Sequence, residues 1–312
     1  MSANGDVSFR PIRDGFGPVE VVGLRPAAVA NAAVRDQLRE ALWTHAVVCI
    51  RFDAPLGEDE ALAVATTIDP LKDLVAPARD GTLMRYGEGL QIVDAGFVLT
   101  DQLRAELGDL NFGGLDPRRP GLFETFHTDD TFTAEPAGVT VLHARELPAR
   151  GGATVFLNMR SAYDLLDPAT RERLVGAYAV HAYNNHGVFP PRRASEGPYE
   201  ALVDVSHPIV RAHPVTGRPA LYFDLDRATH VDGMPEAEGR ALLQMLQNHA
   251  EQRAPRYAHE WQPHDVVMWD NASVQHKASG DFPVGESRRF WRYSIAGSRP
   301  VAYVASGSSG GA

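Results

Sequence analysis

Short runs of β-branched, aromatic and leucine residues recur along the whole 312-residue chain, and glycine, proline and other turn residues separate them. Runs of this kind, roughly four to eight residues long, are typical of β-strands. Helical periodicity is rarer and is clearest at 235–252, where Leu242, Leu243 and Leu246 form an apolar stripe among charged and amide residues. The pattern predicts a mainly β protein with flanking helices and a double-stranded β-helix core, which is a jelly roll of the cupin-like kind.

We expect one large domain over residues 1–305, because the chain is 44% hydrophobic and shows no internal repeat or change of composition. Within it, glycine and proline interrupt residues 75–121 repeatedly. Long irregular segments in compact domains often cover an active site, so this stretch is predicted to be a lid-like insertion. Residues 306–312 contain only Ser, Gly and Ala, and we expect them to form a disordered tail.

Charge and cysteine content limit the partners. The formal net charge is −10, whereas binding to nucleic acid needs a basic surface. The single cysteine, Cys49, lies in an apolar run and cannot form an internal disulfide. The chain shows neither a signal-peptide pattern nor an apolar run long enough to cross a bilayer. We therefore expect a cytoplasmic protein that acts on a small molecule, with no nucleic-acid or membrane partner.

The segment from Phe123 to Phe132 places an imidazole and a carboxylate two residues apart, at His127 and Asp129. On a strand, alternate residues point to the same face, so these two side chains can reach one metal ion while Asp130 faces away. The best candidate for a third ligand is the distant His276. Two histidines and one carboxylate form the facial triad of non-haem Fe(II) oxygenases, which leaves coordination positions for a co-substrate and oxygen.

The triad pattern alone leaves other kinds of protein open. In a sequence with 12 His and 40 Asp plus Glu, a His-x-Asp motif can easily arise by chance. Zn hydrolases also use two histidines and a carboxylate. A hydrolase would act without O2 or 2-oxoglutarate. A non-catalytic barrel that binds a small ligand would tolerate the loss of His127.

Four motifs occur in the order seen in the taurine and 2,4-dichlorophenoxyacetate dioxygenase family, which the chain resembles from about Val19 to about Gly297. The motifs are His127-Thr-Asp129, Gly151-Gly-Ala-Thr154, the segment from Trp269-Asp-Asn271 to His276, and Arg288-Arg-Phe-Trp-Arg292. Members of this family are Fe(II)- and 2-oxoglutarate-dependent dioxygenases.

The resemblance implies oxidation of a substrate carbon, coupled to the conversion of 2-oxoglutarate and O2 into succinate and CO2. Halogenating enzymes of this wider group lack the metal-binding carboxylate, so Asp129 favours hydroxylation. Relatives often form dimers or tetramers, and we expect a homo-oligomer. The resemblance also implies that Trp269, Asp270 and Asn271 orient His276.

The distal carboxylate of 2-oxoglutarate needs a cation, and the planar fork of arginine suits it. Arg288, Arg289 and Arg292 compete for this role. By resemblance, Arg292 fits best, because a small hydroxyl residue and an apolar residue follow it, and Arg289 is second. Thr154 matches the threonine that supplies a hydroxyl partner in the family.

The substrate is predicted less closely. Phe123 and Phe126 precede the first histidine where relatives that act on taurine have a polar stretch, which disfavours taurine. Arg227 lies where some relatives place an aromatic pocket wall, and a cation there could pair with an anionic substrate. The sequence therefore predicts a small organic acid or an amino-acid-like substrate, with Phe123 and Arg227 as candidate contacts.

Overall fold

The computed structural model describes residues 7–12, 17–72, 125–182 and 204–305, and the backbone of three short strands between residues 75 and 98. Most of the predicted lid-like insertion at 75–121, Phe123 and the predicted tail at 306–312 lie outside the described residues. The division into a single domain with a lid and a tail stays a prediction.

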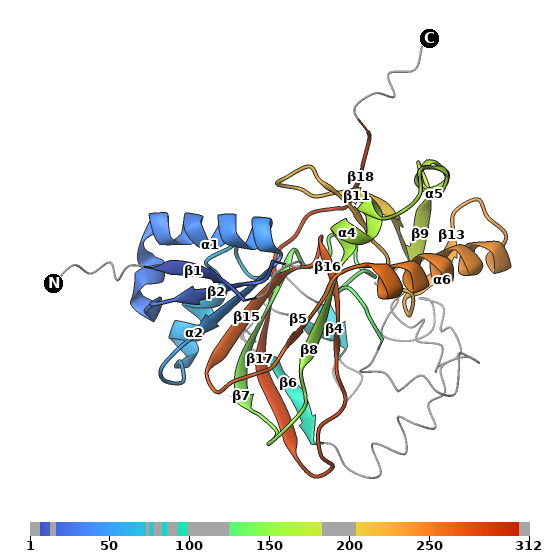
Figure 1. The fold of residues 1–312 in the computed structure, drawn as a ribbon. Helices are drawn as coiled ribbons and strands as arrows, with labels where there is room; N and C mark the ends of the chain where they lie inside the picture. Colours follow the sequence, from blue (N-terminus) through green and yellow to red (C-terminus); the bar gives the residue numbers. More distant parts are fainter. Residues whose placement is uncertain are drawn as a thin grey trace.

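The largest sheet has seven strands, in the order β1-β2-β3-β15-β7-β17-β6 (Figure 1). Neighbouring strands are antiparallel except for β2 and β3, which are parallel and are joined through η1 and α1. A parallel pair needs such a crossover. The elements are β1 (Ser8–Pro11), β2 (Val19–Val22), η1 (Pro26–Ala30), α1 (Ala32–His45), β3 (Val47–Arg51), β6 (Val93–Val98), β7 (Val139–Glu146), β15 (Asp265–Asp270) and β17 (Ser287–Ile295).

Smaller sheets complete the described fold: β14-β8-β16, β10-β9-β13, β12-β11-β18 and the pair β4-β5. Their strands are β4 (Val75–Pro77), β5 (Leu83–Arg85), β8 (Thr154–Asn158), β9 (Tyr178–His181), β10 (Val205–Pro208), β11 (Val210–Ala212), β12 (Pro219–Leu221), β13 (Ala228–Val231), β14 (Arg256–His259), β16 (Val274–Ala278) and β18 (Val301–Ala302). The remaining helices are α2 (Glu58–Ala65), α4 (Met159–Asp164), α5 (Pro168–Arg173) and α6 (Glu236–Arg253).

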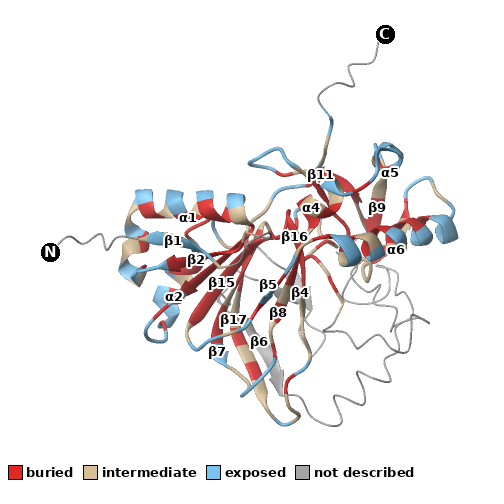
Figure 2. Cartoon of the chain, viewed as in Figure 1, coloured by how far each residue is buried: buried red, intermediate tan, exposed pale blue. Residues whose placement is uncertain are grey.

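Three apolar clusters hold these layers together. One packs α1 and α2 on the large sheet, and another packs α6 against β9, β12 and β13 through the predicted stripe of Leu242, Leu243 and Leu246. The third contains Phe156 of β8 and Trp269 of β15, and it joins the sheet β14-β8-β16 to the large sheet. Buried residues are accordingly concentrated where these two sheets meet (Figure 2).

The predicted β-rich fold with flanking helices is confirmed at that level, and the double-stranded β-helix stays a prediction. Helix α1 begins at Ala32, because Asn31 caps it by accepting a hydrogen bond from Ala33 N–H. One local expectation was wrong. The stretch around His127 is a single bridge followed by a turn, not a strand, because Asp130 has a left-handed backbone with φ of 57°.

In the described part of the chain, no helix is both long enough and apolar enough to cross a membrane.

Gly138, just before β7, and Gly297, just after β17, lie so close together that one added methyl group should destabilise the fold. A Cβ at Gly297 would lie 2.1 Å from the Pro136 carbonyl oxygen and 2.5 Å from the Gly138 nitrogen. Gly297→Ala should therefore lower the free energy of unfolding by at least about 2 kcal/mol, measured by urea denaturation. The control is Gly57→Ala, whose Cβ would meet only Glu60 Oε2 at 3.8 Å, and a change as large as that of Gly297→Ala there would contradict the explanation.

Candidate functional site

A pair of backbone hydrogen bonds brings the two histidines together. The N–H of His127 donates to the carbonyl of His276 at 3.0 Å, and the N–H of His276 donates back at 2.9 Å. Their ring centroids lie 4.3 Å apart. His127 Nδ1 lies 3.1 Å from the Thr125 carbonyl, which only a protonated nitrogen can satisfy, so Nε2 is left as the metal-binding atom.

Asp129 is 6% exposed and is held by a chain of donors. The hydroxyl of Thr140 donates to Asp129 Oδ2 at 2.6 Å, and the amide of Asn271 donates to that hydroxyl at 2.9 Å. The indole of Trp269 in turn donates to Asn271 Oδ1 at 3.0 Å. Every donor in this chain points toward Asp129, which fixes the direction of its carboxylate. Asp129 Oδ2 also lies 3.7 Å from His276 Nε2.

Asp130 points to a different partner. Its carboxylate lies 3.5 Å from the Lys72 ammonium, and its carbonyl accepts a hydrogen bond from Thr133 N–H at 2.9 Å. The left-handed backbone at Asp130 separates its direction from that of Asp129. Among the described residues, the potential ligand atoms of His127, Asp129 and His276 all lie within 4.8 Å of one another, without Asp130.

The charge states of this group fit a divalent metal. Burial alone would raise the pKa of Asp129, but Arg292, the two imidazoles and the Thr140 hydroxyl hold it well below its usual range. Burial lowers the pKa of His276 to about 3, and this outweighs the opposite effect of Asp129. Asp129 therefore offers an ionised carboxylate, and His276 offers a neutral imidazole nitrogen. With the second imidazole of His127, these are the donors of a facial triad.

Trp269 and Phe156 enclose His276, with ring centroids at 4.6 Å and 6.2 Å from its own. His276 lies on β16, a strand that the sequence analysis did not predict. Asn271 acts on the other side of the centre, through Thr140. The expectation was that these residues orient His276. Trp269 contacts the His276 ring, whereas Asn271 reaches Asp129 through Thr140.

Asp270 supports the turn between β15 and β16. Its carboxylate accepts a hydrogen bond from Arg160 at 3.1 Å and one from the Ser273 hydroxyl, and Oδ2 lies 3.0 Å from His213 Nε2. It also accepts a hydrogen bond from Ala272 N–H at 2.9 Å. These contacts fix the start of the strand that carries His276.

The three candidate arginines of β17 have different surroundings. Arg288 is 7% exposed, and it donates to the Gly152 carbonyl at 2.8 Å and to the Thr154 hydroxyl at 2.9 Å. Burial lowers the pKa of Arg288 to about 10. Arg289 is exposed and pairs with Glu146 at 2.8 Å. The Arg292 side chain is 32% exposed, and its Nη2 lies 2.9 Å from Asp129 Oδ1.

Arg227 lies on the loop between β12 and β13, with its guanidinium 4.8 Å from the ring centroid of Phe132. The same loop carries Asp224, and burial raises the pKa of that carboxyl to about 7. The Thr125 hydroxyl donates to Asp226 of this loop, and Gln275 donates to the Phe223 carbonyl at 2.8 Å, so the loop lies next to the segments that carry His127 and His276. A role for Arg227 in substrate binding stays a prediction, and Phe123 lies outside the described residues.

Thr140, the direct partner of Asp129, was not predicted as a site residue. It lies in β7, and threonine is common in strands for its β propensity alone. Its role depends on which strand pairs with which, and the sequence of one chain carries no local signal for that pairing.

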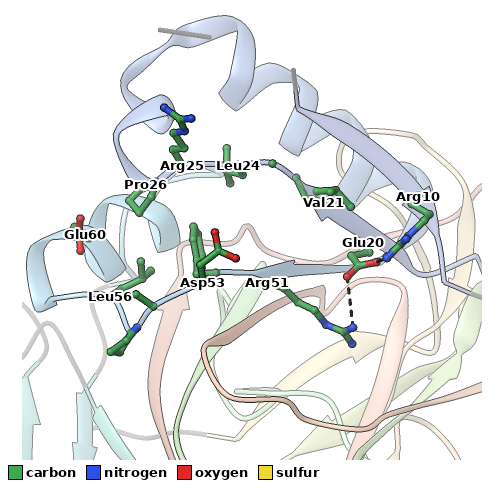
Figure 3. A pocket seen from close by; sticks show the side chains of 15 residues that line it. Arg10, Glu20, Val21, Leu24, Arg25, Pro26, Arg51, Asp53, Leu56 and Glu60 are labelled. Atoms are coloured by element: carbon green, nitrogen blue, oxygen red, sulfur yellow. Dashed lines mark hydrogen bonds and ion pairs between the residues drawn. The ribbon is translucent and has the colours of Figure 1, made fainter. Parts of the chain in front are cut away.

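A separate cavity of about 690 Å³ lies between β2, η1 and β3 (Figure 3). Part of its charged lining is paired, because Glu20 bridges Arg10 and Arg51. The cavity shares no lining residue with the metal ligands or with the arginines of β17. It is not part of the candidate site.

The buried Asp270 predicts a pH-dependent contribution to stability. Burial would raise its pKa, but the hydrogen bond and charge of His213, followed by Arg160, lower it from an ordinary value of 3.8 to about 2. A depressed pKa stabilises the folded state above the unfolded-state pKa, and this contribution is lost as the pH falls through the folded-state pKa. The contribution should be on the order of 2 kcal/mol at pH 6.

The measurement is the free energy of unfolding of the wild type and of Asp270→Asn between pH 7 and pH 2.5. The difference in free energy of unfolding between the wild type and Asp270→Asn should become smaller below about pH 4. A residual gap that does not depend on pH reflects the unpaired Arg160. A gap that stays constant over the whole range would contradict the depressed pKa.

Comparison with known proteins identifies the family. The model of the family described as "Taurine catabolism dioxygenase TauD, TfdA family" matches residues 8–294. The chain is 33% identical over 264 residues to the alpha-ketoglutarate-dependent 2,4-dichlorophenoxyacetate dioxygenase of Cupriavidus pinatubonensis, covering 83% of this chain and 87% of that protein. It is 28% identical over 305 residues to the (S)-phenoxypropionate/alpha-ketoglutarate-dioxygenase of Sphingobium herbicidovorans, covering 95% and 96%.

A solved structure agrees with this result. The crystal structure of AAD-2 in complex with Mn(II) and N-oxalylglycine superposes with a TM-score of 0.75 at 26% identity, covering 96% of this chain and 99% of that one. These relatives give no support to the hydrolase or the non-catalytic barrel. The chain belongs to the TauD/TfdA family, and it is an alpha-ketoglutarate-dependent dioxygenase.

Proposed function

We propose that the protein is an Fe(II)-dependent hydroxylase of a small anionic substrate, with His127, Asp129 and His276 as the metal ligands. The observation that carries this proposal is the meeting of those three side chains, together with the buried cation Arg288 on the strand whose Arg292 contacts Asp129. We further propose that the large sheet and the sheet β14-β8-β16 are the two halves of a double-stranded β-helix, with the metal between them.

Fe(II) bound there supplies the centre at which 2-oxoglutarate and O2 react, and the overall reaction converts these two and a C–H bond into succinate, CO2 and a C–OH group. The protein's own contribution is orientation and charge. The chain Trp269–Asn271–Thr140 aims Asp129, and the Thr125 carbonyl selects the tautomer of His127. A retained carboxylate at position 129 supports hydroxylation as the outcome.

For the distal carboxylate of 2-oxoglutarate we propose Arg288 with Thr154, in place of the predicted order of Arg292 first and Arg289 second. Arg288 is the most buried of the three and forms no ion pair with a described carboxylate. A buried guanidinium whose protein partners are neutral gains most from an anionic ligand. Arg289 is exposed and pairs with Glu146, and Arg292 lies at Asp129, whereas the distal carboxylate is at the end of 2-oxoglutarate that does not chelate the metal.

The position of Arg288 along β17 also suits a partner of the distal carboxylate of 2-oxoglutarate. Arg288 and Arg292 are four residues apart, so their Cα atoms are separated by about 13 Å in a strand and both side chains point to one face. Arg292 reaches Asp129 at the metal, while Arg288 reaches Thr154. A five-carbon diacid that chelates the metal can extend from the first position toward the second.

For the substrate we propose a small organic acid, with Arg292 or Arg227 as its counter-ion. Arg292 is partly exposed beside the metal ligands, so a substrate held by it would lie close to the reacting centre. The substrates in the names of two relatives, 2,4-dichlorophenoxyacetate and phenoxypropionate, are carboxylic acids. This supports the predicted anionic substrate.

The assignment of Arg288 predicts unequal effects of two neighbouring substitutions. Arg288→Met should raise the KM for 2-oxoglutarate about 30-fold or more, because the carboxylate loses a buried charged partner. Arg289→Met is the matched control and should change this KM by less than about two-fold, because Arg289 forms an exposed ion pair. The measurement is succinate formation with Fe(II) and ascorbate. Similar effects at both positions would exclude the assignment.

A substrate screen tests the anionic substrate. Small carboxylic acids, phenoxyacetates among them, should include compounds that couple their own oxidation to succinate formation, whereas their neutral amides should not. If Arg292 is the counter-ion, Arg292→Gln should raise the KM for the acid about ten-fold or more. If Arg227 is the counter-ion, Arg227→Ala should raise the KM by a similar factor. Binding of Mn(II) is measured in parallel, because Arg292 contacts Asp129. Unchanged KM values in both variants would rule out both counter-ions.

A further inference from the structure

Trp261 lies two residues after the end of β14, and its indole reaches the subsite proposed for the co-substrate. The indole N–H donates to Thr154 Oγ1 at 3.0 Å, and Arg288 Nη2 donates to the same oxygen at 2.9 Å. A hydroxyl group has two acceptor positions and one proton. Both acceptor positions of Thr154 are therefore occupied, and its proton must go to a third group.

The protein itself offers no such group where the structure is described. Thr154 is 2% exposed, and its hydroxyl donates to no acceptor in the described ranges. A buried hydroxyl proton without an acceptor is costly, so a ligand oxygen in this position is favoured. We propose that Trp261 is a positioning residue, whose N–H directs the Thr154 proton onto the distal carboxylate of 2-oxoglutarate. This inference rests on the proposed placement of that carboxylate beside Thr154 and Arg288.

Two aromatic neighbours hold the Trp261 ring in place. The ring of His259 meets it edge-on, with centroids 4.7 Å apart and an interplanar angle of 84°, and Phe290 lies at 4.5 Å. The guanidinium carbon of Arg288 also lies 4.5 Å from the ring centroid of Phe290. One phenyl ring therefore supports both donors to Thr154, and the two donors keep a constant relative position.

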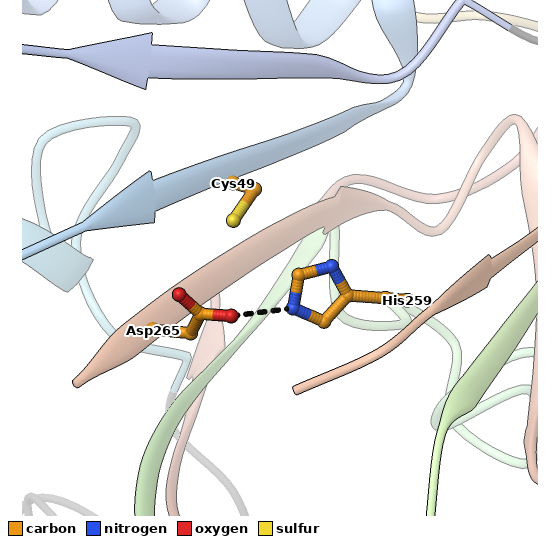
Figure 4. Close-up of side chains that lie close together, drawn as sticks. All are labelled: Cys49, His259 and Asp265. Carbon is orange, nitrogen blue, oxygen red and sulfur yellow. Dashed lines mark hydrogen bonds and ion pairs between the residues drawn. The ribbon is translucent and has the colours of Figure 1, made fainter. Parts of the chain in front are cut away.

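A buried group of polar side chains orients His259 (Figure 4). His259 Nε2 lies 2.9 Å from Asp265 Oδ2, and the Tyr257 hydroxyl lies 2.8 Å from His259 Nδ1. Asp265 Oδ2 also accepts a hydrogen bond from Gln262 N–H at 2.9 Å.

Cys49 lies close to this group and could in principle complete a second metal site. Burial raises the pKa of its thiol far above the usual range, so the thiol stays protonated beside Asp265. The imidazole nitrogens of His259 are both engaged in hydrogen bonds. The group therefore acts as a support for Trp261, and not as a ligand set.

The arrangement has a consequence for co-substrate choice. A hydroxyl that accepts two N–H groups is polarised and cannot rotate, so it is a stronger and better directed donor than a free one. That donor serves a ligand with a second carboxylate, such as 2-oxoglutarate, and offers nothing to a 2-oxoacid without one. Trp261 should therefore affect the affinity for the co-substrate and leave the affinity for metal unchanged.

The test is a double-mutant cycle on ligand binding. The Kd of N-oxalylglycine, an analogue of 2-oxoglutarate, is measured by calorimetry with the Mn(II)-loaded full chain. Trp261→Phe keeps an aromatic ring and removes the N–H, and it should weaken binding about three- to ten-fold. In a Thr154→Val background the same change should weaken binding less than about two-fold, because the hydroxyl on which it acts is absent. An equal loss in both backgrounds would show that Trp261 acts by packing alone and would overturn the inference.

Three controls separate the possible failures. Trp43→Phe, a Trp→Phe change on α1, should leave the Kd unchanged. If Trp261→Phe does not fold, replacement of Trp261 by benzothienylalanine, which keeps the ring shape and lacks the N–H, gives the same comparison. Arg288→Met tests the proposed function separately. If Arg288→Met binds N-oxalylglycine normally, the placement of the carboxylate is wrong. If it loses binding while Trp261→Phe does not, only the role of Trp261 is wrong.

Discussion

The reciprocal backbone hydrogen bonds between His127 and His276 decide where the proposed metal ligands lie. They join a turn to strand β16, and they bring the two imidazoles to a centroid distance of 4.3 Å. The backbone, and not the side chains, therefore sets this geometry. Asp129 then needs only a fixed direction, which the relay through Thr140 provides. Ligands positioned by paired backbone are held more precisely than ligands on free loops.

Asp129 and Arg288 are both buried charged groups, but the first has charged partners and the second has neutral ones. Asp129 is balanced by Arg292 and by two imidazoles, which overcome the effect of burial on its pKa. Arg288 has neutral partners, the Gly152 carbonyl and the Thr154 hydroxyl, and burial lowers its pKa. An unpaired buried ion costs several kcal/mol, so the site at Arg288 is one that an anionic ligand stabilises strongly. This cost is the physical reason for the proposed placement of the distal carboxylate at Arg288.

Much of the fold follows from local sequence, whereas the site depends on pairing. The helix at 235–252 and most strands are where periodicity predicts them, because burial of one face has a local signature. His127 and Asp129 converge as predicted, but through a turn at Asp130 and not along a strand. The choice between Arg288 and Arg292 could not be made from their spacing, since both lie on one face of β17. It depends on which end of the strand meets Asp129, and the register with β7 sets that.

The position of both arginines on one strand has a consequence for the proposed co-substrate site. Arg292 lies at Asp129 and Arg288 at the Thr154 hydroxyl, so the β17 backbone sets the separation of the two guanidinium groups. A strand deforms little, and the co-substrate can therefore be held in the same way whatever the substrate is. Differences in substrate between relatives must then arise from side chains and loops around this constant frame. Trp261 is part of this frame, because it lies between His259 and Phe290, packs against the cluster of Phe156 and Trp269, and donates to the Thr154 hydroxyl.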